Sequence, residues 1–73
     1  MKIEQLITMA NQIGTFFKST PDTDQAKKDI AMHLKRFWAL SMRLQLIEHA
    51  QNEGAGLEPI VKDAILQHQA LLA

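Results

Sequence analysis

The segment from His33 to Arg43 (HLKRFWALSMR) gathers the side chains best suited to molecular recognition in this 73-residue chain. It holds the only Trp of the sequence, Trp38, directly after Phe37, and three of the eight Lys and Arg residues. Arg and Trp are the residue types most enriched at the energetic centres of protein interfaces. This segment therefore indicates noncovalent contact with a partner. The residues expected to make the contact are His33, Arg36, Phe37, Trp38 and Arg43.

Three histidines have the side chain for metal binding or proton transfer, but their spacing favours neither role. His33, His49 and His68 fall on three different predicted helices. A metal site on a helix has its second ligand four residues after the first. Only His49 is followed at that distance by a residue that can ligate a metal, Glu53, and Glu53 lies at a predicted helix end. Each histidine lies on or beside an apolar helix face. We therefore expect packed, hydrogen-bonded histidines and no metal site.

Catalytic residue patterns are also missing from the sequence. The two serines, Ser19 and Ser41, belong to no nucleophile motif, and there is no glycine-rich phosphate loop. The Gly-Ala-Gly run at 54–56 is too short for a nucleotide-binding fingerprint and follows no predicted strand. The chain has no cysteine, which excludes disulfides, thiolate-ligated metals and thiol redox centres. We expect a protein that is not an enzyme on its own and that binds no cofactor itself.

Charge is balanced over the chain but unevenly distributed. Eight Lys and Arg residues match eight Asp and Glu residues, which argues against nucleic-acid or membrane-surface binding through a net basic footprint. Residues 27–43 nevertheless carry a net charge of +4, and residues 44–73 carry −3.

No apolar run approaches the roughly 20 residues of a membrane span, and the N-terminus lacks signal-peptide features. We therefore expect a cytoplasmic protein.

The elements that must position these residues are helices. Apolar residues recur at helical spacing in four stretches, around residues 3–17, 26–37, 42–50 and 60–72. We expect the second stretch to bury one stripe, formed by Ala26, Ile30, Leu34 and Phe37. The first and third stretches have apolar arcs wider than one core contact requires, so part of their surface is expected to face another protein. The prediction is a single all-α domain over residues 1–73, a small bundle of three to four helices.

Loop signals separate these helices. Thr20 or Asp22 is suited to cap the second helix. Gly54 or Gly56 is suited to end the third helix in the left-handed conformation, and Pro59 fits the first turn of the fourth. These two glycines and the proline are expected to set the geometry of the last helix pair.

Four features allow two explanations each. Gly14, inside the first apolar face, marks either the close approach of a neighbouring backbone or an incidental glycine. Trp38 is either core filler or an exposed anchor. Arg43, within an apolar arc, either extends its stem outward to solvent or reaches an acidic group in the bundle or on a partner. Residues 38–40 contain no strong helix breaker, so the second and third helices are either separate or continuous.

At these same residues the chain resembles the delta subunit of bacterial NAD-dependent formate dehydrogenases that contain molybdenum or tungsten. Members of that family begin with a similar pattern to residues 6–17 (LITMANQIGTFF), followed by a proline–aspartate turn. They continue with patterns matched here by residues 30–38 (IAMHLKRFW), Met42-Arg43 and residues 54–61 (GAGLEPIV). This chain departs at residues 39–41, where Ala-Leu-Ser replaces the Asp-Pro and basic residue usual in the family.

The resemblance implies a non-catalytic accessory subunit that binds the molybdenum-containing catalytic alpha subunit and supports its assembly, cofactor retention or activity. Bis-molybdopterin guanine dinucleotide, iron–sulfur clusters, FMN and NAD are implied in the partner subunits, not in this chain. The isolated chain is either a monomer or a homo-oligomer. Two alternatives are a transient assembly chaperone of the same enzyme and a small nucleic-acid binder that uses its basic segment, the weaker of the two because the net charge is zero.

Overall fold

Helices form the whole regular framework of the chain, and there is no β-strand. The computed structural model describes every residue from Met1 to Ala73. The helices are α1 (Ile3–Phe17), α2 (Thr23–Phe37), α3 (Leu40–Gln51), α4 (Pro59–Gln67) and α5 (Gln69–Leu72). The all-α bundle predicted from the sequence is confirmed, with one difference: the fourth predicted helix is divided at His68 into α4 and the short α5. None of the helices has the length and apolar character needed to cross a membrane.

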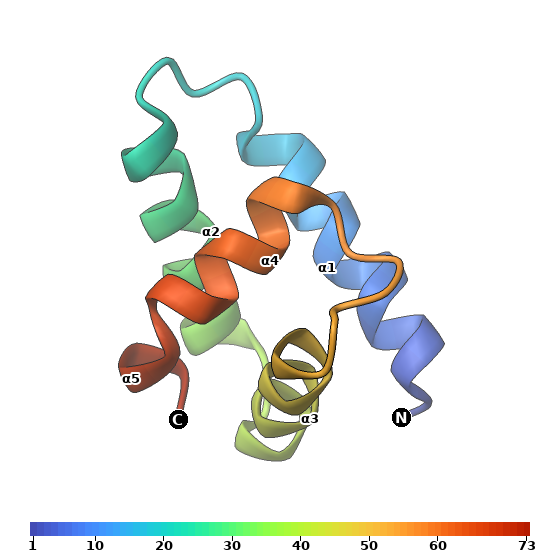
Figure 1. Ribbon diagram of the computed structural model, residues 1–73. Helices are drawn as coiled ribbons and strands as arrows, with labels where there is room; N and C mark the ends of the chain where they lie inside the picture. The colour runs from blue at the N-terminus through green and yellow to red at the C-terminus, as the bar shows by residue number, and fades with distance from the viewer.

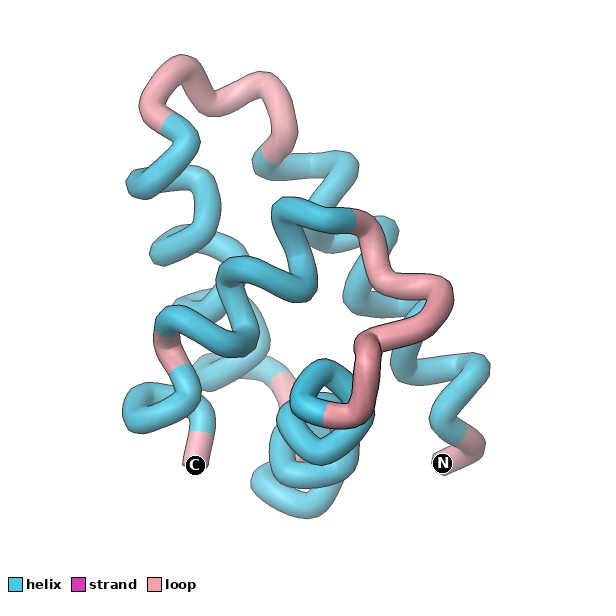
Figure 2. The backbone as a smooth tube through the Cα atoms, in the orientation of Figure 1, coloured by secondary structure: helices cyan, strands magenta, loops and turns pink.

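The helices pack around α4. α1 and α2 are joined by a loop and lie against each other, and α4 crosses in front of both (Figure 1). α3 lies at the lower end of this view, where it packs against α1 and α4, and α5 closes the bundle against α2 and α3. Figure 2 shows the two long loops, which connect α1 to α2 and α3 to α4. This arrangement leaves one side of the α1–α2 pair facing α4 and the other side open.

A local signal sets the start of α2, whereas tertiary packing sets its end. The Asp22 carboxylate caps the helix by accepting hydrogen bonds from the backbone N–H groups of Asp24 and Gln25, at 3.0 and 3.3 Å. At the other end the backbone of Trp38 is extended, with ψ of 141°. The Trp38 side chain is only 7% exposed and joins the core. Because no Gly or Pro is present, we infer that burial of this indole stabilises the break that separates α2 from α3.

Phe37 does not belong to the buried stripe predicted for the second helix. Ala26, Ile30 and Leu34 are buried as expected, but Phe37 is 71% exposed. The physical reason is the break after it: the extended backbone at Trp38 directs the larger indole into the core and leaves the Phe37 ring outside. Trp38 is therefore core filler, one of the two roles open to it.

Gly14 marks a close approach between α1 and α4. A Cβ atom at this position would overlap Cγ2 of Val61, which is itself fully buried. The approach predicted from the mid-helix glycine is real, but a side-chain methyl group makes it, not a neighbouring backbone. The absence of a side chain at Gly14 therefore allows α4 to sit close to α1.

The turn between α3 and α4 is held by a side chain from the first helix. Glu53, Gly54 and Gly56 all have positive φ, at 76°, 65° and 86°, and Pro59 begins α4. The Asn11 amide donates to the Gly56 carbonyl and accepts from the Glu58 N–H, both at 2.9 Å. One side chain of α1 thus satisfies two backbone groups of a turn 45 or more residues away.

Candidate partner-binding surface

Four aromatic rings form a continuous row across α1 and α2. The Phe16 and Phe17 rings meet edge to face with centroids 5.0 Å apart. The Phe17 ring lies 6.1 Å from the His33 imidazole, which in turn lies 4.7 Å from the Phe37 ring. These separations fall in the range of favourable aromatic pairs. We call Phe16, Phe17, His33 and Phe37 the aromatic row.

The two ends of the aromatic row are exposed. Phe16 is 76% exposed and Phe37 is 71% exposed, whereas Phe17 and His33 between them are half-buried. Met32, on the same side of α2, is also exposed. Isolated exposed apolar side chains are ordinary, but a contiguous set of large ones marks a binding surface in a soluble chain. Each exposed ring therefore packs against one ring of the half-buried pair.

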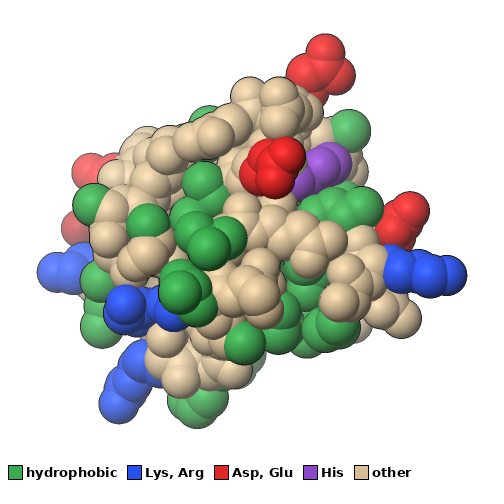
Figure 3. Space-filling model, turned by 90° about the horizontal axis from the view of Figure 1, so that it is seen from below, with side chains coloured by type: hydrophobic (Ala, Val, Ile, Leu, Met, Phe, Trp, Pro, Cys, Tyr) green, Lys and Arg blue, Asp and Glu red, His purple; other side chains and the backbone are tan.

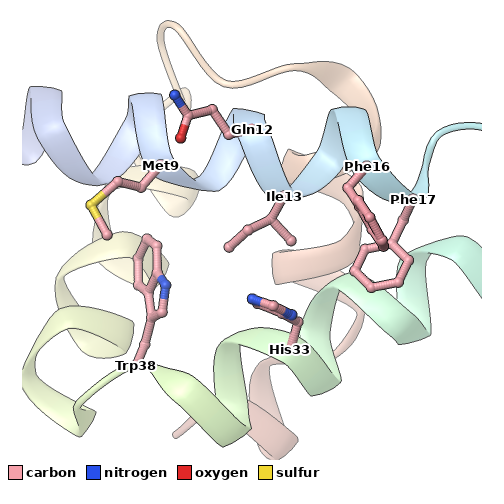
Figure 4. Close-up of a pocket in the computed structure, with 7 residues that line it drawn as sticks. All are labelled: Met9, Gln12, Ile13, Phe16, Phe17, His33 and Trp38. Atoms are coloured by element: carbon pink, nitrogen blue, oxygen red, sulfur yellow. The ribbon is translucent and has the colours of Figure 1, made fainter.

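A groove of about 370 Å³ runs between α1 and α2 beside the aromatic row. Figure 4 shows Trp38 at one end of it and Phe16 and Phe17 at the other, with Ile13 and His33 projecting into the space between the helices. Met9 lies near Trp38, and Gln12 lies on the outer side of α1. A second, smaller hollow shares two residues with the groove and is lined by Phe17, Asp29, Met32, His33, Arg36 and Phe37. The groove, the hollow and the aromatic row therefore form one surface.

The charged residues around this surface are predominantly basic. Lys28, Lys35 and Arg36 are exposed. Lys28 lies four residues before Met32 on α2, and Lys35 and Arg36 lie three and four residues after it, so the three cations surround Met32 on the helix. Lys18 directly follows Phe17 but lines a separate cavity together with Glu58. None of these four cations forms an ion pair, because the one salt bridge of the chain joins Lys27 to Asp63, at 3.7 Å. Asp29 lines the smaller hollow together with Arg36, and Gln25 donates to it at 2.9 Å.

Four of the five residues predicted to contact a partner lie at this surface. His33, Arg36 and Phe37 line the smaller hollow, and His33 and Trp38 line the groove. Arg43 is separate from them, on the buried face of α3. It is 9% exposed, and its Nε and Nη1 atoms are buried without a hydrogen-bond partner. The five side chains are close in sequence, but the fold divides them between this surface and, for Arg43, an interior position.

The residues that α1 contributes to this surface cannot be identified from the sequence alone. Helical spacing places Phe16, Phe17 and Ile13 together on the apolar face of the first helix, yet Phe16 is the most exposed large hydrophobic residue of the chain. The signal was present as the excessive width of that apolar arc. Which of its residues remain outside depends on the angle at which α2 and α4 cover α1.

The three histidines lie apart from one another in the fold. The Nε2 atom of His49 lies 2.7 Å from the Ala55 carbonyl oxygen, His33 belongs to the aromatic row, and His68 stands at the junction of α4 and α5. No three His, Asp or Glu side chains converge closely enough to hold a metal ion.

A separate apolar area lies near the start of α3, where Leu40 and Leu44 are about half exposed. Figure 3 shows the molecule from below, with hydrophobic side chains across the middle of this face and most of its Lys and Arg side chains to the left. Leu40 and Leu44 line neither the groove nor the hollow. They therefore provide a matched comparison for the aromatic row.

Comparison with curated proteins and with solved structures gave no match. A family model, described as NADH-dependent formate dehydrogenase delta subunit, matches residues 5–65, which include α1, α2, α3 and most of α4. With the greater part of the sequence matched, the chain belongs to the family of NADH-dependent formate dehydrogenase delta subunits.

Proposed function

We propose that this chain is a non-catalytic, cytoplasmic accessory subunit that binds the molybdenum-containing catalytic alpha subunit of a formate dehydrogenase. In this role it supports assembly of the alpha subunit, retention of its cofactor or its activity. Family membership points to the complex. The observation that carries the binding role is the aromatic row, whose two ends, Phe16 and Phe37, are large apolar side chains that are 76% and 71% exposed.

The accessory role is supported by what the sequence supplies. The chain has no cysteine with which to ligate an iron–sulfur cluster. Its three histidines lie on different helices or their junctions. We propose that bis-molybdopterin guanine dinucleotide, the iron–sulfur clusters, FMN and NAD all reside in the partner subunits, and that this chain contributes contacts only.

The test is to express the complex with and without this chain, using an affinity tag on the alpha subunit. We expect the chain to copurify with the alpha subunit, and its deletion to lower the yield of assembled complex or its molybdenum content. An unchanged yield, molybdenum content and formate oxidation rate after deletion would contradict the proposal.

The same purification separates a permanent subunit from a transient assembly chaperone. A permanent subunit is present at constant stoichiometry in the purified, active complex. A chaperone is found only with alpha subunit that lacks its cofactor. We expect the first result, because both exposed phenylalanines are then covered in the finished complex.

A further inference from the structure

We infer that the aromatic row and its surrounding cations form the docking surface for the alpha subunit, and that the matching site there is an apolar pocket bordered by Asp and Glu side chains. This inference rests on the proposed function and adds to it the contact residues and the chemistry of the partner site.

The aromatic row has the physical properties of an interface centre. Phe16 and Phe37 present large apolar areas, and each packs against a half-buried neighbour in the row. An anchor that is ordered before binding loses little conformational entropy when it binds. Large side chains that fill a partner pocket dominate binding energy at most interfaces. The partner site must therefore offer apolar depressions for two rings, and an apolar side chain of its own for the groove between α1 and α2.

The charge around the row determines the rest of the partner site. Lys28, Lys35 and Arg36 surround Met32 on α2, are exposed and form no ion pair, while the acidic residues of this helix are Asp24 and Asp29. An apolar pocket with a basic border would bring like charges together, whereas carboxylates would pair with these cations and accelerate association. An acidic border is therefore the complementary arrangement.

A second copy of this chain does not satisfy these requirements. In a two-fold dimer the same surface meets itself, so Lys35 and Arg36 of one copy would face the cations of the other. Helix α2 carries four cations, Lys27, Lys28, Lys35 and Arg36, against two acidic residues, Asp24 and Asp29. Two copies meeting through this helix would therefore bring two surfaces of net positive charge together. The charge distribution therefore favours a different protein over a homodimer.

The experiment measures binding of the purified full chain to formate dehydrogenase assembled without it and immobilised through the alpha subunit. The test variant is F16A/F37A, and the control is L40A/L44A, which removes two exposed apolar side chains from a different area. We expect the test variant to bind about 100-fold more weakly, as for loss of two anchors, and the control to bind within threefold of the wild type. Circular dichroism melting curves establish that both variants are folded.

The electrostatic part is tested by R36E against K2E, which change the net charge equally at different places. We expect R36E to weaken binding at least tenfold at low salt and to reduce its salt dependence, and K2E to have little effect. Equal effects of the two substitutions would overturn the acidic border.

The outcomes separate the inference from the proposed function. If the wild-type chain does not bind the alpha subunit, the proposed function fails. If it binds and F16A/F37A binds equally well, only the docking surface is wrong. Sedimentation of the free chain as a dimer that F37A dissociates would assign the surface to a second copy. Salt-sensitive binding of a single-stranded oligonucleotide that R36E abolishes would assign it to nucleic acid.

Discussion

The His33 imidazole lies against the Phe37 ring, with their centroids 4.7 Å apart and their planes tilted by 44°. Because the two residues are four positions apart on α2, the helix itself places one ring beside the other. The contact keeps Phe37 in a defined orientation although most of its surface faces solvent.

The first prediction concerns this pair. H33A and F37A are each expected to reduce the stability of the isolated chain slightly, and the double variant less than the sum of the two. The coupling free energy should be about 0.5–1.5 kcal/mol, as for other aromatic pairs. Urea unfolding of the four proteins of the cycle measures it. Strict additivity would mean that the rings do not support each other in solution.

The second prediction concerns the contact between α1 and α4. Replacing Gly14 by Ala should destabilise the chain by about 1–3 kcal/mol, since the new methyl group overlaps Val61. Helix propensity alone predicts the opposite, a gain of about 1 kcal/mol. The sign of the change in urea unfolding therefore decides between packing and propensity.

The control for this prediction is the V61A background. Removing the two Val61 methyl groups destabilises the core, but it also makes room for a side chain at position 14. We expect G14A to be neutral or stabilising there. A loss as large as in the wild-type background would show that Val61 is not the obstacle.

The third prediction concerns the start of α3. Ala39 is the N-cap residue, and no side chain caps the helix. A39D should stabilise the chain by about 1 kcal/mol, because its carboxylate can accept from the free N–H groups of the first turn. Thermal melting at neutral pH measures the gain, which should shrink as the carboxylate is protonated in acid. A39N, a cap without charge, separates the hydrogen bond from the helix-dipole effect.

The fourth prediction concerns Arg43. Its Nε and Nη1 atoms are buried without partners, and an unpaired buried guanidinium costs free energy. We expect R43M, which keeps the apolar stem, to raise stability by about 1 kcal/mol, equivalent to about 4–8 °C in Tm. R43A should lower stability, because it leaves a cavity. A loss of stability in R43M would show that Arg43 has found a partner in solution.

The sequence predicts the parts of this fold that depend on local signals. Helical periodicity indicates α1 to α4, the Asp22 cap begins α2, and glycines with Pro59 form the turn before α4. The junction of α2 and α3 is different, because adjacent residues Phe37 and Trp38 are both large and apolar. Only the packed structure decides that the indole enters the core and the phenyl ring stays outside.

The candidate surface, too, can be predicted from the sequence only in part. His33, Arg36 and Phe37 are recognisable from sequence because they lie within one turn of one helix. Phe16 and Phe17 join them only through the packing of α1 against α2, which no local pattern specifies. The position of Arg43 also depends on tertiary packing, since it lies on the buried face of α3 with Leu46, Ile47 and Ala50.

The hydrogen bonds of Asn11 to residues 56 and 58 have a consequence for the timing of synthesis. Asn11 leaves the ribosome more than 40 residues before the backbone groups that it binds, and Val61 reaches Gly14 later still. α4, which packs on both α1 and α2, is therefore absent while most of the chain is being made. A nascent chain that ends before Val61 therefore has α1 and α2 without the helix that packs on both, and we expect such a chain to hold the aromatic row less firmly than one that includes α4.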